Sequence, residues 1–274
     1  MFGLYSREYI RFKNLSPKTD ENYRTALTSV SKSIGDLELS ELTFEHILKW
    51  NDDMRENGLM ISTMRVHLSK LKNVLLFGVK RGHTNFNVDQ IELPKSPIKP
   101  PRYLTLVEVR KLMDTAETTR GKAIIAVFFS SGIRCSELAR LNRRDYIEGE
   151  LFVHGKGNVY RTSYIDATAI VLLDKYLESR TDGLEALFVG QKNQRLCKDT
   201  IEHIVHDIAE KAQIPNVTPH VLRHSYATSL AQQGIGAFHL QKLLGHAHIS
   251  TTQIYVHLSN KDAKTAYKQF HIGV

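Results

Sequence analysis

The sequence predicts a two-domain protein that is mainly α-helical, with one small antiparallel β-hairpin in an α+β second domain. Three observations support this fold class. Apolar residues recur at helical spacing through residues 1–93. A stretch rich in proline and basic residues, 94–102, separates that part from the remainder. Two short β-rich runs on either side of G-K-G-N give the one clear strand signal in the sequence.

The first predicted domain, residues 1–93, reads as a small helical bundle. Its helices begin at a capping Ser or Thr and end at a Gly, which are the usual start and stop signals of a helix. We expect them at residues 16–35, 43–58 and 62–82.

The third of these helices carries basic residues away from its apolar stripe. Met64, Leu68 and Leu75 repeat at helical spacing and predict the buried face. The basic residues that lie largely off this stripe are Arg65, Lys70, Lys72, Lys80 and Arg81. They form either an ordinary solvated face or a surface for a polyanion, and the sequence of this domain alone leaves both open.

Residues 94–102 form the predicted linker. They contain four of the seven prolines of the chain, a density that prevents a helix and gives an extended, semi-rigid connector. The basic residues Lys95, Lys99 and Arg102 lie within it.

The second predicted domain, residues 103–274, mixes helices with the hairpin. Thr105 and Glu108 have capping-box spacing, and K-A-I-I-A-V-F-F-S-S-G predicts a buried helix. The runs E-L-F-V-H and V-Y-R-T-S-Y-I predict the two strands of the hairpin. Further helices are expected at 167–180 and 200–211, a short strand at L-F-V between them, and a final helix within 256–274.

The composition favours a polyanionic partner. The formal charge is +8 and the pI is near 9.3, spread over both domains rather than gathered in a basic tail. Two cysteines, Cys135 and Cys197, make neither a disulfide framework nor a zinc set, which fits a reducing compartment. With no long apolar run and no signal-peptide pattern, we expect a cytoplasmic protein without a membrane segment.

The stretch from Thr218 to Tyr255 concentrates the residues suited to phosphate chemistry. Thr218 and Pro219 predict a helix start that places His220 and Arg223 on one face. A second short helix ends at Gly245, a plausible C-cap, with the next histidine just beyond it. An arginine, imidazoles and a phenol near one another can hold a phosphodiester, stabilise its extra negative charge and attack it.

The order H-x-x-R-H, L-G-H, Tyr resembles the C-terminal half of the catalytic domain of tyrosine recombinases, the integrase family. Upstream, S-G-I-R-C-S-E-L is similar to the first arginine motif of that family, with Ser131 where Thr is usual. The resemblance covers residues 103–260, and over 1–93 it is architectural only. It implies a helical core-binding (SAM-like) DNA-binding domain at 1–93, a catalytic domain at 103–274 and a compact Xer-like type.

The resemblance implies a role for each matching residue. The catalytic positions are Arg134, Lys156, His220, Arg223, His246 and Tyr255, and the supporting positions are Glu137 and Asp145. Tyr255 would be the nucleophile, His220 its general base and Lys156, in the hairpin turn, the general acid. Two arginines would clamp the phosphate, and His246 would add a hydrogen bond. No cofactor, ATP or metal is required by this chemistry.

The resemblance also implies the partners. Double-stranded DNA would be recombined through a 3′-phosphotyrosyl intermediate and a Holliday junction by a homotetramer. The basic residues named above in 1–93 and the linker would contact that DNA. The C-terminal helix would pack into a neighbouring protomer or fold back on its own domain, and the need for an accessory protein is left open.

Three alternatives remain at this stage. A zinc site is suggested by His220 and His224 at i,i+4, but H-V-L-R-H lacks the Glu of H-E-x-x-H and an intervening arginine would oppose a dication. A DNA-binding protein of recombinase descent that no longer cuts, and an enzyme that relaxes DNA as type IB topoisomerases do, would both share much of this sequence.

Overall fold

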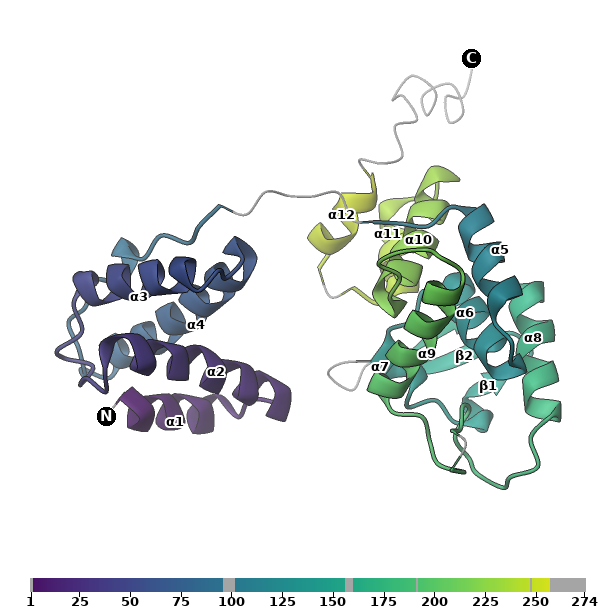
Figure 1. The fold of residues 1–274 in the computed structure, drawn as a ribbon, viewed down its shortest axis with the longest axis horizontal. Coiled ribbons are helices and arrows are strands. Elements are labelled where there is room, and N and C mark those ends of the chain that lie inside the picture. Colours follow the sequence, from purple (N-terminus) through teal and green to yellow (C-terminus); the bar gives the residue numbers. More distant parts are fainter. Residues whose placement is uncertain (1, 96–101, 156–159, 191, 247, 257–274) are drawn as a thin grey trace, which may run out of the picture. The chain divides into compact units, whose positions relative to one another are not determined.

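The computed structural model divides the chain into two compact units, Met1–Lys99 and Pro100–Val274 (Figure 1). It describes residues 2–95, 102–155, 160–190, 192–246 and 248–256. The division between the units falls within the predicted linker, most of which lies outside the described residues.

The first unit is a bundle of four α-helices. They are α1 (Phe2–Lys13), α2 (Pro17–Ile34), α3 (Phe44–Glu56) and α4 (Ile61–Lys80), followed by the 3₁₀ turn η1 (Val88–Gln90). Ser16 and Thr43 cap α2 and α3 with their side chains, and Gly35 ends α2 with a positive φ, as the sequence predicts. Helix α4 begins one residue before the predicted start, without a side-chain cap.

A single apolar core holds this bundle together. Trp50 of α3 and Leu71 and Leu75 of α4 are among its fully buried side chains. The α4 residues Met64, Leu68, Leu71 and Leu75 repeat at helical spacing, so the apolar stripe read from the sequence is the buried face.

The second unit is mainly helical and contains the small sheet. Its helices are α5 (Leu106–Thr115), α6 (Thr119–Ser131), α7 (Cys135–Leu138), η2 (Arg143–Asp145), α8 (Ala167–Glu178), α9 (Lys198–Lys211), α10 (Pro219–Gln232), α11 (Ala237–Leu244) and α12 (Ser250–Val256). Helix α6 is buried along most of its length and packs against α5, α8, α9 and α10 (Figure 1). The capping box at Thr105 and the helix start at Thr218 are both confirmed.

The sheet is antiparallel, with the order β1 (Tyr146–Ile147), β2 (Glu150–His154) and β3 (Tyr160–Tyr164). The predicted hairpin is therefore present, and the mainly α fold class with a small antiparallel sheet is confirmed. The sequence analysis missed β1, which joins β2 through Glu148 and Gly149, both at positive φ. The short strand expected at L-F-V was wrong, because isolated bridges at Ala186 and Val189 replace it.

Gly132 forms the turn between the end of α6 and the segment that follows it. It ends α6 in the left-handed conformation, with a φ of 61°. A Cβ added there would lie 2.3 Å from Cδ1 of Tyr226 on α10. Only glycine fits this turn. The segment I-R-C-S-E-L follows it directly.

We predict that Gly132→Ala destabilises the second unit by about 2–4 kcal/mol, because it combines overpacking with left-handed strain. Trp50, the only tryptophan of the chain, lies in the first unit, so its fluorescence reports that unit separately from the circular dichroism of all helices. The dichroism transition should move to lower urea while the Trp50 transition stays in place. Gly183→Ala, where an added Cβ meets nothing within 4 Å, is the control. Equal effects of the two substitutions would contradict the prediction.

Candidate active site

Two arginines, one just before α7 and one on α10, meet at the C-terminal end of α11. Arg134, the residue before α7, donates from Nη2 to the carbonyl of Gly245 at 3.1 Å. Arg223 of α10 donates from Nη2 to the carbonyl of Leu244 at 2.6 Å. The last carbonyls of a helix lack intrahelical partners and carry its negative dipole end, so cations are stabilised there. The turn L-L-G-H is therefore the place where both predicted clamp arginines converge.

Arg223 is the more deeply placed of the two, with a relative exposure of 3%. Its Nη1 donates to the carbonyl of Gly132 at 2.6 Å, so it joins the end of α6 to the end of α11. Burial, followed by the charge of Arg134, lowers the pKa of Arg223 to about 10. The guanidinium still carries its charge near neutral pH.

Glu137 supports Arg134 from one turn away. Its carboxylate accepts from the backbone N–H of Arg134 at 2.7 Å and from Nη1 of Arg134 at 2.9 Å. It also accepts two hydrogen bonds from Arg161 of β3, at 3.0 and 2.8 Å. Burial alone would raise the pKa of Glu137, but the hydrogen bonds and charge of Arg161, and then those of Arg134, lower it to about 2.

His246 lies directly after the arginine-bound turn. Gly245 adopts a φ of 62° as the predicted C-cap, and His246 follows it half-buried. Its Nδ1 shares a hydrogen bond of 3.0 Å with Oγ1 of the buried Thr252 on α12. Burial, followed by the charges of Arg223 and Arg134, lowers the pKa of His246 to about 4. The ring is therefore neutral near pH 7.

Tyr255 is buried and hydrogen-bonded to a histidine. Its relative exposure is 1%, and its hydroxyl contacts Nδ1 of His224. His224 packs edge-on against His220, with ring centroids 4.3 Å apart. Burial raises the pKa of Tyr255 to about 12, although Arg223 opposes this, and burial lowers the pKa of His224 to about 4. At neutral pH the phenol is thus the donor and the imidazole the acceptor.

The structure brings together five of the six predicted catalytic positions within one unit, through α7, α10, α11 and α12. Lys156, the sixth, lies outside the described residues. His220 is the exposed member of the histidine pair, and its pKa is lowered by partial burial and then by Arg223 and Arg134. Asp145 accepts a hydrogen bond from the backbone N–H of Asn142 at 2.8 Å. This bond caps the turn η2, to which Asp145 itself belongs.

Sequence reasoning missed Arg161, and it considered His224 only as part of a zinc site that it argued against. A signal for Arg161 was present, because strand alternation places it on the same face as the buried Ser163, where a charge needs a partner. The pairing of His224 with Tyr255 had no sequence signal, since it depends on how α12 packs against α10.

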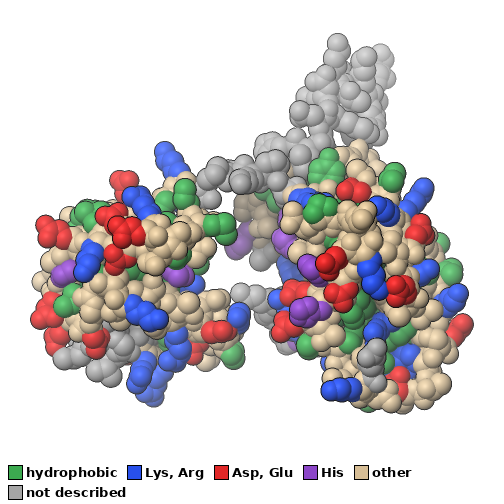
Figure 2. All heavy atoms as spheres, in the orientation of Figure 1, with side chains coloured by type: hydrophobic (Ala, Val, Ile, Leu, Met, Phe, Trp, Pro, Cys, Tyr) green, Lys and Arg blue, Asp and Glu red, His purple; other side chains and the backbone are tan. Residues whose placement is uncertain are grey.

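The basic residues predicted to contact DNA have varied surroundings. In the first unit, Lys70 donates to the carbonyl of Asn22 and Lys72 to that of Ile91. Arg65 donates to the carbonyl of Pro94, while Arg81 lies over the rings of Phe12 and Phe77 and beside Glu8. Lys80 and Lys95 are exposed, Arg102 lies 3.9 Å from Glu108, and Lys99 is outside the described residues. Figure 2 shows basic and acidic side chains interspersed over the visible face of each unit.

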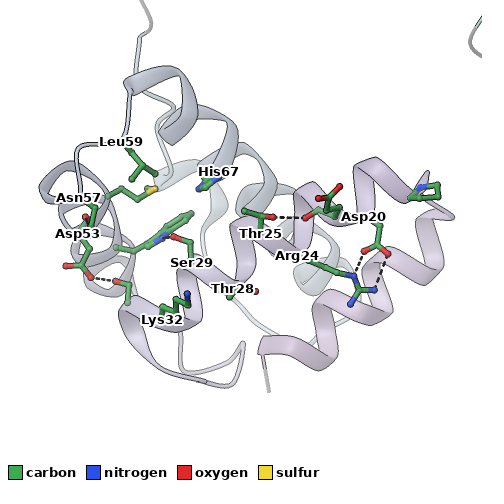
Figure 3. Close-up of a pocket in the computed structure, with 15 residues that line it drawn as sticks. Asp20, Arg24, Thr25, Thr28, Ser29, Lys32, Asp53, Asn57, Leu59 and His67 are labelled. Carbon is green, nitrogen blue, oxygen red and sulfur yellow. Dashed lines mark hydrogen bonds and ion pairs between the residues drawn. The ribbon is translucent and has the colours of Figure 1, made fainter. Parts of the chain in front are cut away.

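A groove of about 840 Å³ lies in the first unit, along α2, α3 and the start of α4 (Figure 3). Its charges are mixed: Arg24 is paired with Asp20 at 2.6 Å, and Asp53 is hydrogen-bonded to Ser33. Trp50 lines it and donates to Oγ of Ser29 at 3.0 Å. This groove belongs to a different unit from the arginine and histidine cluster.

Within the described ranges, no group of three or more His, Cys, Asp or Glu side chains is placed to hold a metal ion. Over the same residues, no helix has the length and apolar character needed to cross a membrane.

The fold and this cluster define a two-domain enzyme of the tyrosine recombinase class. Residues 102–262 match the model of the phage integrase family, and residues 3–82 match that of the phage integrase N-terminal SAM-like domain. The chain therefore belongs to the phage integrase family.

Individual relatives agree with this assignment. The chain is 31% identical to tyrosine recombinase XerC of Roseiflexus castenholzii (strain DSM 13941 / HLO8), over 93% of this chain and 88% of the relative. It matches the crystal structure of XerA recombinase with a TM-score of 0.55 and 27% identity, over 100% and 99% of the two chains. A lambda integrase tetramer bound to a Holliday junction shares the fold, with a TM-score of 0.77 and 19% identity over 95% and 78%.

We predict that the stability of the second unit falls as the pH drops from about 6.5 towards 4. His224 and His246 have folded-state pKa values of about 4, so the unfolded chain, with His pKa values of 6.5, binds protons that the folded chain does not. Urea unfolding followed by circular dichroism at several pH values measures the slope. His246→Asn should flatten it, whereas His203→Asn on the exposed side of α9 should not. An unchanged slope in His246→Asn would contradict the assignment.

Proposed function

We propose that this chain is a site-specific DNA recombinase that cleaves and rejoins strands through a 3′-phosphotyrosyl intermediate and a Holliday junction. The observation that carries the proposal is the convergence of Arg134 and Arg223 on the single turn that leads into His246, in the same unit as Tyr255. Guanidinium groups remain charged and bind phosphate oxygens in a bidentate way. This cluster is suited to the doubly charged transition state of phosphodiester exchange.

Each member of the cluster has a proposed role. Arg134 and Arg223 bind the non-bridging oxygens, and each keeps N–H groups beyond those that hold the carbonyls of Gly245, Leu244 and Gly132. His246, neutral near pH 7, supplies one further hydrogen bond. Lys156 is proposed as the general acid for the 5′-hydroxyl that leaves.

In this proposal, two histidines take part in removing the proton of Tyr255. The sequence assigns the general base to His220, but the hydroxyl of Tyr255 contacts His224, which in turn packs against His220. We propose that Nδ1 of His224 takes the hydroxyl proton as the oxygen of Tyr255 attacks the phosphorus, while His220 packs against His224 and faces solvent. A bound phosphate would displace the phenol from its buried position, where the pKa of about 12 disfavours attack.

The proposed partner is double-stranded DNA, held by the basic residues of the first unit, the linker and the arginine cluster. The lambda integrase structure is a tetramer on a Holliday junction, and we propose a homotetramer on DNA here as well. Exchange of the C-terminal helix between protomers is part of this proposal, and residues 257–274, which would form it, lie outside the described residues. An accessory protein remains an open part of it.

The proposed reaction uses neither ATP nor a metal, since the phosphotyrosyl bond conserves the energy of the broken phosphodiester and the arginines supply positive charge. A protein that acts on chromosomal or mobile-element DNA in a bacterium or archaeon would work in the cytoplasm.

We predict that Tyr255→Phe abolishes covalent attachment to DNA and leaves binding intact, because only the nucleophilic oxygen is removed. The assay uses a nicked duplex suicide substrate, with DNA from the region flanking the gene, in EDTA, followed by a denaturing gel. Tyr164→Phe, which alters an exposed tyrosine of β3, is the control and should form the adduct normally. An adduct formed by Tyr255→Phe would place the nucleophile elsewhere.

The same assay separates the alternatives. Tight binding without any adduct in the unaltered chain would favour a DNA-binding protein that no longer cuts. An adduct accompanied by relaxation of supercoiled plasmid, but with no joining between two duplexes, would favour topoisomerase-like activity.

We predict that Arg134→Ala lowers the rate of adduct formation roughly 100- to 1000-fold, the usual cost of removing one donor that stabilises transition-state charge. Its side chain is partly exposed, so the substitution leaves the core packing in place. Arg140→Ala, which removes an exposed arginine two residues past the end of α7, is the charge-matched control. Cleavage by Arg134→Ala at the rate of the control would remove Arg134 from the clamp.

A further inference from the structure

We propose that Arg161 is a positioning residue for strand cleavage, which fixes Arg134 through Glu137 and fixes the turn before His246 through Leu243. The inference rests on the proposed function and adds a residue to that site. Arg161 lies on β3, and neither the arginine motif nor the Thr218–Tyr255 stretch includes it.

Arg161 occupies an inward position of the sheet. It pairs with Val153 of β2, which is fully buried, and lies two residues from the fully buried Ser163. Its side chain is 12% exposed. A buried charge is costly unless it is paired and hydrogen-bonded, so the partners of Arg161 decide its position.

The principal partner is Glu137, whose carboxylate is fully occupied. Arg161 donates from Nη1 to Oε1 at 3.0 Å and from Nη2 to Oε2 at 2.8 Å, the bidentate geometry that a guanidinium forms best. Arg134 completes the set with its backbone N–H and Nη1. The relative exposure of Glu137 is 3%. Without Arg161, the carboxylate would be left with Arg134 alone and would compete with phosphate for the donors of that residue.

The second partner is the end of α11. Nε of Arg161 lies 3.4 Å from the carbonyl of Leu243, which precedes the two carbonyls bound by Arg223 and Arg134. Three arginines therefore contact three consecutive carbonyls, 243, 244 and 245. The guanidinium also packs closely against Gly245, where an added Cβ would be 2.9 Å from its Nε. Arg161 thus limits where the turn, and His246 after it, can lie.

A purely structural role is the competing explanation, and another arginine shows what that role looks like. Arg195 donates to the carbonyls of Ala139 and Leu141 and to the side chain of Asn142, and among the described residues it makes no hydrogen bond to Glu137 or to the α11 turn. Arg195→Gln is therefore the matched control for losing an arginine that holds backbone carbonyls in the same unit.

The experiment measures cleavage per active molecule. Arg161→Gln, Arg161→Lys and Arg195→Gln are made in the full chain, and single-turnover adduct formation is followed at saturating suicide substrate. The endpoint gives the active fraction, the time course gives the rate, and a separate titration gives the dissociation constant for DNA. A positioning role lowers the rate, whereas a structural role lowers the active fraction and the melting temperature.

We expect Arg161→Gln to slow cleavage about 100-fold, the scale on which a displaced catalytic group loses rate, with little change in DNA affinity. Arg161→Lys, which keeps the charge and one hydrogen bond, should recover part of the loss even if Arg161→Gln folds poorly. Arg195→Gln should cleave at the rate of the unaltered chain.

A double-mutant cycle with Glu137→Gln tests whether Arg161 affects the cleavage rate through Glu137. If Arg161 acts through Glu137, Arg161→Gln should cost far less in the Glu137→Gln background than alone, because neighbours in one network are non-additive. Additive losses of cleavage rate would overturn the claim that Arg161 acts through Glu137.

The outcomes separate this inference from the function on which it rests. An adduct in the unaltered chain, formed equally fast by Arg161→Gln, would overturn the role of Arg161 and leave the recombinase proposal standing. Absence of any adduct from the unaltered chain would overturn both. A loss confined to active fraction, without a change in rate, would assign Arg161 to folding alone and also overturn the inference.

Discussion

The structure of the second unit depends on three guanidinium groups that bind the C-terminal end of one helix, α11. Arg161, Arg223 and Arg134 contact the carbonyls of residues 243, 244 and 245 in turn. The negative end of α11 offsets part of their mutual repulsion, and the carboxylate of Glu137 pairs with two of them. Because these bonds connect α6, α7, α10, α11 and β3, the positive cluster and the fold of the unit are held by the same interactions.

This arrangement leaves a concentrated positive charge beside histidines that stay neutral. His246 and His224 have pKa values of about 4, in both cases chiefly because of burial, followed by Arg223 and Arg134 for His246 and by His220 and Arg223 for His224. Neutral imidazoles can accept or donate a hydrogen bond without adding charge, as His224 does with the hydroxyl of Tyr255. Within the cluster the positive charge is therefore carried by the arginines, while the buried histidines are neutral hydrogen-bonding groups.

The two units differ in how they use their basic residues. In the second, Arg134, Arg161 and Arg223 are bound to the carbonyls of residues 243–245, so their positions are set before any ligand arrives. In the first, Arg65, Lys70 and Lys72 make single bonds to backbone carbonyls at the surface, and the groove along α2 balances Arg24 with Asp20. Surface contacts of this kind are weak and can be exchanged for phosphate contacts. A preorganised cluster in one unit and exchangeable basic contacts in the other are both compatible with the proposed function on DNA.

The mainly α fold class, the caps at Ser16, Thr105, Thr218 and Gly245, and the hairpin could all be predicted from the sequence. So could the choice of candidate site residues, which are Arg134, Arg223, His246 and Tyr255. These follow from local rules, since caps, turns and helical spacing act over a few residues and a motif keeps its residues in order. Tertiary structure decided the rest. The bond between Arg161 and Glu137 joins residues 24 positions apart, and that between His224 and Tyr255 joins residues 31 apart. No local pattern specifies such pairs, because they exist only once β3 and α7, or α10 and α12, pack together.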